Sequence, residues 1–117
     1  MPRYEVNEEG VRHARKLIDE GTYDVETEWS EVEPSAQDEN QVIESKGYEE
    51  FGRWYLAVNP EAREETKARY AFPYGDFRKV YRAALIHAKQ RASQNDHVEI
   101  EKAADELLQR LDRKAKA

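Results

Sequence analysis

The chain has 117 residues, 38% hydrophobic and 38% charged, a balance that predicts one domain with a modest core. Its two Trp, seven Tyr and three Phe argue against a disordered chain, because disordered segments are poor in aromatic residues. The net charge of -6 argues against unspecific nucleic-acid binding, and the lack of cysteine excludes disulfides and thiolate chemistry.

No segment approaches the ~20 apolar residues that a membrane-spanning helix needs. The first ten residues contain no apolar stretch suited to a signal peptide, so a soluble, cytoplasmic protein is expected. Charge is unevenly distributed along the sequence. Residues 1–65 carry 7 basic and 18 acidic side chains, residues 66–94 carry 7 and one, and residues 95–117 carry 5 and 6.

A first helix is predicted over 8–20. Asn7 can cap it, and Glu8 and Glu9 place negative charge in the first turn, where the helix dipole favours it. Gly21 stands at the expected end. The apolar residues at helical spacing are Val11, Ala14, Leu17 and Ile18.

The next segment, 22–34, is rich in acidic residues and is predicted to be a loop. Trp29 is expected to fold back onto the core, because a large apolar ring is costly to leave in water. A second helix is predicted to begin at Ser35, with Asp38 completing a capping box, and to end at Gly47.

Two short strands are predicted in the middle of the chain. The first covers 53–58, where alternation places Trp54, Leu56 and Val58 on one face. A helical turn over 60–66 follows, since Asn59 and Pro60 form a good helix start. The second strand covers 68–72, and a turn over Pro73-Tyr74-Gly75 closes it.

The strongest helical periodicity lies near the carboxyl end. A helix over 77–93, capped by Asp76, and a second over 98–112 are joined by a short link, which predicts an antiparallel hairpin. The expected core cluster is Trp54, Phe72, Phe77, Tyr81, Leu85, Leu107 and Leu111.

The sequence therefore predicts a single, mostly helical α+β domain over 1–117. It should have four helices, a minimal two-stranded β element and the hairpin as scaffold. Residues 1–6 and 114–117 are expected to fray. An all-helical bundle is the alternative.

Catalytic patterns are missing. The serines fall in loops or at helix ends, outside any nucleophile-elbow pattern, and the histidines, His13, His87 and His97, are far apart in sequence. The five glycines form no phosphate-binding motif. We therefore expect no enzyme, no catalytic residue, no metal site and no cofactor.

Basic and aromatic side chains alternate between residues 67 and 91. The basic ones singled out are Arg69, Arg78, Lys79, Arg82 and Lys89. Basic groups neutralise phosphates and aromatic rings stack on unpaired bases, which would suit nucleic acid. Alternatively, the rings belong to the core and the cations complement the acidic first half of the chain.

Residues 52–112 contain an aromatic-Pro turn, an Asp-Phe pair, a Val-x-Arg helix and a closing Ala-Ala…Leu-Leu helix. The stretches that carry the pattern are RYAFPYGDFRKVYRAALIHAKQRASQ, residues 69–94, and IEKAADELLQRLD, residues 100–112. This pattern resembles a small uncharacterised prokaryotic domain family and is similar to segments of some phage-associated proteins. The resemblance implies a shared helical hairpin and no assigned activity.

Two functions of different classes follow. The first is a non-enzymatic interaction module that binds a protein partner or a second copy of itself. The second is an accessory nucleic-acid-binding protein that uses the five basic residues of 67–91. No membrane partner is expected.

Overall fold

The computed structural model describes residues 3–116. Within that range the chain forms five α-helices, five short strands and one 3₁₀ turn, so the mostly helical α+β fold is confirmed and the all-helical alternative is not. The elements are, in chain order, β1 (Glu5–Val6), α1 (Glu8–Asp19), β2 (Tyr23–Asp24), α2 (Trp29–Val32), α3 (Ala36–Gly52), β3 (Tyr55–Val58), η1 (Lys67–Arg69), β4 (Tyr70–Pro73), β5 (Val80–Tyr81), α4 (Arg82–Gln94) and α5 (Val98–Lys116).

A three-stranded antiparallel sheet has the order β1-β3-β4, and a separate parallel pair joins β2 to β5. The two predicted central strands are present as β3 and β4, paired with Ala57 opposite Ala71. β1 pairs with the other edge of β3, Val6 opposite Ala57, so the expected two-stranded element has a third strand. Two-residue strands such as β1 and β2 carry no periodic pattern, and for this reason the sequence does not reveal them.

Strand β3, which is shorter than the predicted 53–58, is buried on both faces. Tyr55, Leu56 and Ala57 are all buried. Helices α1 and α5 pack against β3, and the ring of Phe51 lies 4.9 Å from that of Tyr55. The predicted helical turn at 60–66 is also absent. The one helical turn in this region is η1, which begins at Lys67.

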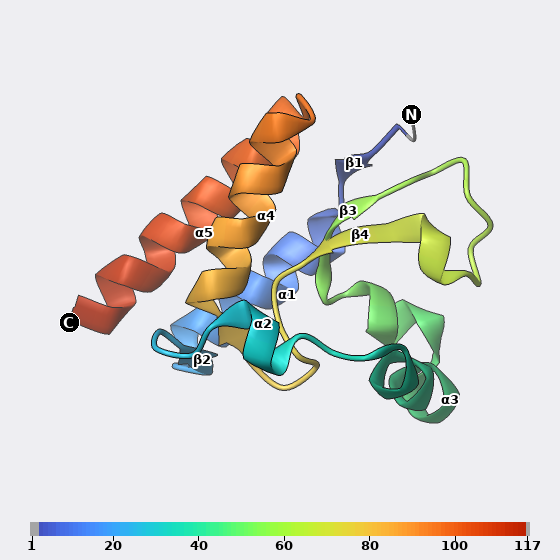
Figure 1. Ribbon diagram of the computed structural model, residues 1–117, viewed down its shortest axis with the longest axis horizontal. Coiled ribbons are helices and arrows are strands. Elements are labelled where there is room, and N and C mark those ends of the chain that lie inside the picture. Colours follow the sequence, from blue (N-terminus) through green and yellow to red (C-terminus); the bar gives the residue numbers. More distant parts are fainter. Residues whose placement is uncertain (1–2, 117) are drawn as a thin grey trace.

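The carboxyl-terminal hairpin is confirmed: α4 and α5 lie side by side and antiparallel (Figure 1). However, α4 begins at Arg82 and not at residue 77. Asp76 does cap, but it caps a turn, because its Oδ1 accepts hydrogen bonds from the backbone N–H groups of Arg78 and Lys79. Phe77 has a left-handed backbone with φ 69°, which cannot continue a helix.

The two ends of the described chain are more ordered than the expected fraying. Glu5 and Val6 are in β1, and α5 continues to Lys116. Residues 1, 2 and 117 lie outside the described range. Helix α5 also packs against α1 and β1, and the Arg110 guanidinium donates to both carboxylate oxygens of Asp19 at 2.8 and 2.7 Å. The first and last helices are thereby joined.

The acidic segment 22–34 contains β2 and α2 and is therefore not only a loop. Trp29 is buried, as predicted, but in a small second cluster with Tyr81 and Ala84. The capping box of Ser35 and Asp38 is present. The predicted end at Gly47 is instead a kink, with φ 88°, after which α3 continues to Gly52.

The predicted core is largely found. Trp54, Leu85, Leu107 and Leu111 are buried in the main cluster, Phe72 and Phe77 are half-buried against it, and Tyr81 belongs to the second cluster. No helix of the described residues is long and apolar enough to cross a membrane.

Candidate interaction surfaces

Two of the five basic residues singled out in 67–91 are held by acids on α5. Arg82 donates from Nε and Nη2 to the two carboxylate oxygens of Asp112, at 2.7 and 3.2 Å. This bidentate contact raises the pKa of Arg82 and lowers that of Asp112. Lys89 donates to Asp105 at 2.8 Å. Both cations therefore brace the hairpin.

The other three basic candidates, Lys79, Arg69 and Arg78, differ in the contacts that they make. Lys79 Nζ lies 3.9 Å from Asp24 and 5.7 Å from the centre of the Tyr81 ring. Arg69 donates to the carbonyl oxygen of Ala62 at 2.8 Å. Arg78 is exposed and makes no ion pair within the described range. Two of the acids that pair with the segment lie on α5, and two, Asp24 on β2 and Glu39 on α3, lie in the first half of the chain, so the expected balance with that half is only partly found.

The aromatic side chains of the same segment are mostly packed inside. Tyr74 is fully buried, its hydroxyl donates to the carbonyl oxygen of Arg53 at 2.7 Å, and burial raises its pKa. Burial and a 2.8 Å hydrogen bond to Asp76 raise the pKa of Tyr81 to about 12. Rings committed to the core in this way are not free to stack on bases.

A groove of about 740 Å³ lies between α2, α3 and the turn at 76–78, and we call it the α3 groove. Its apolar lining comes from Val32, Pro34, Val42 and Phe77. Its charged lining comes from Asp38, Glu44, Asp76 and Arg78. Of the five basic candidates, only Arg78 lines it.

The groove owes its shape to local constraints on both walls. On the α3 wall, the capping box of Ser35 and Asp38 fixes the start of the helix. On the other wall, the left-handed backbone of Phe77 turns the chain, and its ring packs 5.7 Å from Phe51 and 6.0 Å from Trp54. A strained non-glycine residue at a cavity wall is typical of a functional site.

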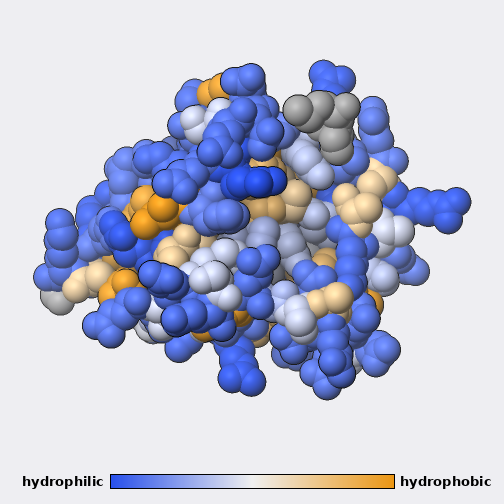
Figure 2. All heavy atoms as spheres, in the orientation of Figure 1, coloured by the Kyte–Doolittle hydropathy of each residue, from blue (hydrophilic) through white to orange (hydrophobic). Residues whose placement is uncertain are grey.

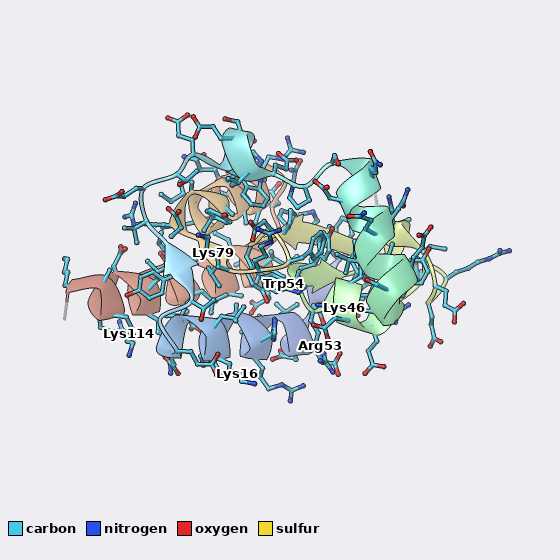
Figure 3. All side chains as sticks on the ribbon, turned by 90° about the horizontal axis from the view of Figure 1, so that it is seen from below. Lys16, Lys46, Arg53, Trp54, Lys79 and Lys114 are labelled. Carbon is cyan, nitrogen blue, oxygen red and sulfur yellow. The ribbon has the colours of Figure 1, made fainter. Side chains whose placement is uncertain are left out.

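The groove lies in the most acidic part of the chain. Residues 22–50 carry ten acidic side chains and one basic side chain, Lys46. Several exposed cations that make no ion pair within residues 3–116 lie elsewhere, on α1 and at the end of α5, among them Arg12, Arg15, Lys16, Arg113 and Lys114. Figure 3 shows Lys16 and Lys114 on this outer edge, with Trp54 inside.

The histidines divide into two places. His87 and His97, distant in sequence, both line a second pocket beside β4 and α4, whereas His13 lies on α1 against Trp54. Among residues 3–116 no group of three or more His, Asp or Glu side chains is placed to hold a metal ion.

Comparison with known proteins found no matching family model, no matching curated protein and no matching solved structure.

Proposed function

We propose that this protein is a non-enzymatic interaction module, and that the α3 groove binds a cationic amphipathic segment of a partner protein. The observation that carries the proposal is the combination of half-buried apolar side chains with the exposed acids Asp38 and Glu44 in one groove, which lies largely in the most acidic stretch of the chain. Grooves that receive an amphipathic helix have this general character, with apolar anchors below and complementary charge around them.

The lining residues suit the two faces of such a segment. Apolar side chains of the partner would contact Val42 and Phe77, while its cations would lie near Asp38 and Glu44. Arg78 stands on the same rim and would select for a partner with an acidic residue at that end, because two cations repel.

The nucleic-acid alternative has weaker support at the residues that suggested it. Arg82, Lys89 and Lys79 are near acids of the same chain, and Arg69 is engaged by a backbone carbonyl. Phosphate binding would have to compete with these contacts, leaving Arg78 as the exposed candidate.

The test is an NMR titration of the labelled protein with a synthetic helical peptide that has Leu and Lys at i, i+3 and i+4 spacing. We expect shifts confined to residues of the α3 groove. Charge reversal in Glu44→Lys should weaken binding about threefold to tenfold, since one exposed attraction becomes a repulsion.

Glu99→Lys is the matched control, because it makes the same charge change on the first turn of α5, outside the groove. Equal losses for both variants would mean only general charge attraction and would contradict the groove. Titration with single- and double-stranded DNA and RNA tests the alternative, whose mark would be an affinity that falls steeply as salt rises.

A further inference from the structure

A second pocket, of about 490 Å³, lies between β4 and α4, and α2 closes one end of it. Its volume falls within the range of small-molecule sites, roughly 300–1,000 Å³. In Figure 2 a hollow with pale and tan atoms occupies the centre of this face, with blue, hydrophilic atoms around it. The pocket does not share a lining residue with the α3 groove.

One wall is aromatic. Tyr4 and Phe72 meet edge to face with ring centroids 6.0 Å apart, and His97 packs edge-on to both at 5.6 and 5.8 Å. Trp29 forms the end beside α2. The backbone of Phe72 is left-handed, with φ 64°, so a strained residue again carries a ring into a cavity wall.

Another wall is polar and comes from α4 and its C-cap. His87 and Arg91, four residues apart, lie on one side of the helix, Asn95 follows at the C-cap, and all three line the pocket. The Arg91 guanidinium makes no ion pair within residues 3–116. Among the lining residues the acid is Glu33, beside Trp29.

From this arrangement we propose that the pocket binds a small planar aromatic anion. The ring would lie against Tyr4 and Phe72, and its carboxylate, phosphate or sulfonate would accept hydrogen bonds from Arg91, with His87 beside it. A guanidinium that makes no ion pair is a strong donor for such groups. The aromatic ring of the ligand, stacked beneath the Arg91 guanidinium, adds an aromatic contact.

The probes are two dyes that differ by one charged group: 8-anilino-1-naphthalenesulfonate and uncharged N-phenyl-1-naphthylamine. We expect Arg91→Ala to weaken the sulfonate dye about fivefold or more, because a charge-assisted hydrogen bond is lost, and to leave the uncharged dye within about twofold. Arg113→Ala, an exposed arginine on α5 outside the pocket, should change neither.

Further variants separate ring from charge. Phe72→Ala should weaken the binding of both dyes. If that variant is less stable than the parent, Tyr4→Ala tests the same aromatic wall. Glu33→Gln should tighten the sulfonate dye. Near-ultraviolet circular dichroism of every variant must match that of the parent, since such dyes also bind partly unfolded chains.

Displacement of the dye by an aryl carboxylate or by a nucleoside monophosphate would support the site and identify the anionic group. The proposal is overturned if Arg91→Ala binds the sulfonate dye as tightly as the parent. It is also overturned if both dyes weaken equally in Arg91→Ala, or if neither natural-type anion displaces the dye, which would then be an adventitious additive only.

Discussion

The imidazole of His13 lies edge-on to the indole of Trp54, with ring centroids 5.0 Å apart and an angle of 79° between the planes. Its Nε2 atom is buried and has no hydrogen-bond partner within the described residues. Burial lowers the pKa of His13, Glu50 counteracts the shift, and Arg53 and Lys16 add to it. Folding therefore favours the neutral ring.

This contact predicts that the protein loses stability as pH falls from neutral. The unfolded chain protonates His13 near its ordinary pKa of about 6.5, whereas the folded chain protonates it only at lower pH. Between these two pKa values the unfolded state binds more protons than the folded state, so the free energy of unfolding decreases as the pH is lowered. Urea unfolding at several pH values between 7.5 and 5 measures this decrease.

His13→Gln is the control for this prediction. It should flatten the dependence in that range, because the lowered carboxylate pKa values of Asp19 and Asp112 act at more acidic pH. A variant that keeps the parent slope would assign the effect to other groups.

A second prediction concerns the Arg82–Asp112 pair. Its side chains remain 37% and 34% exposed, so water screens the attraction, and a double-mutant cycle with alanine should give a coupling of about 1 kcal/mol. The same cycle on Glu99 and Lys102, which are 3.8 Å apart and far more exposed, should give a coupling near zero. Equal couplings would show that the bidentate geometry contributes nothing.

A third prediction concerns Gly10, where α1 touches β3. A Cβ atom there would lie 1.9 Å from the backbone carbonyl oxygen of Tyr55, so Gly10→Ala must push the helix off the strand. We expect a loss of roughly 2–4 kcal/mol in chemical denaturation. Gly21→Ala is the comparison: it meets no atoms, but its φ of 81° strains an alanine, at about 1 kcal/mol. Similar losses would contradict the close approach.

The fourth prediction concerns the Tyr81 hydroxyl. Its pKa of about 12 should appear in an ultraviolet titration as a tyrosine that ionises later than an exposed one. Asp76→Asn removes the negative neighbour and should lower that pKa without restoring the ordinary value, because burial is the larger cause. An unchanged titration in the variant would mean that the hydrogen bond does not form.

Helix α5 could be predicted from sequence because its buried residues repeat at helical spacing, and Ser35 because a capping box is a local pattern. The start of α4 could not. Asp76 is equally suited to capping a helix or a turn, and only the pairing of β5 with β2 decides between them.

The surfaces were harder to predict than the helices. Both walls of the α3 groove are far apart in sequence, and so are His87 and Tyr4 in the second pocket. Which cations are neutralised also depends on distance in space: Arg82 and Asp112 are separated by 30 positions. Composition identifies the charged residues, but only packing selects those that remain available to a partner.

The packing of α1 against α5 has a consequence for how the protein is made. The amino-terminal helix emerges from the ribosome early, yet the surface that shelters its apolar stripe is not synthesised until residues 98–116 follow. Contacts that span so much of the chain form slowly and late. Nascent chains that stop short of α5 should therefore remain accessible to chaperones and proteases.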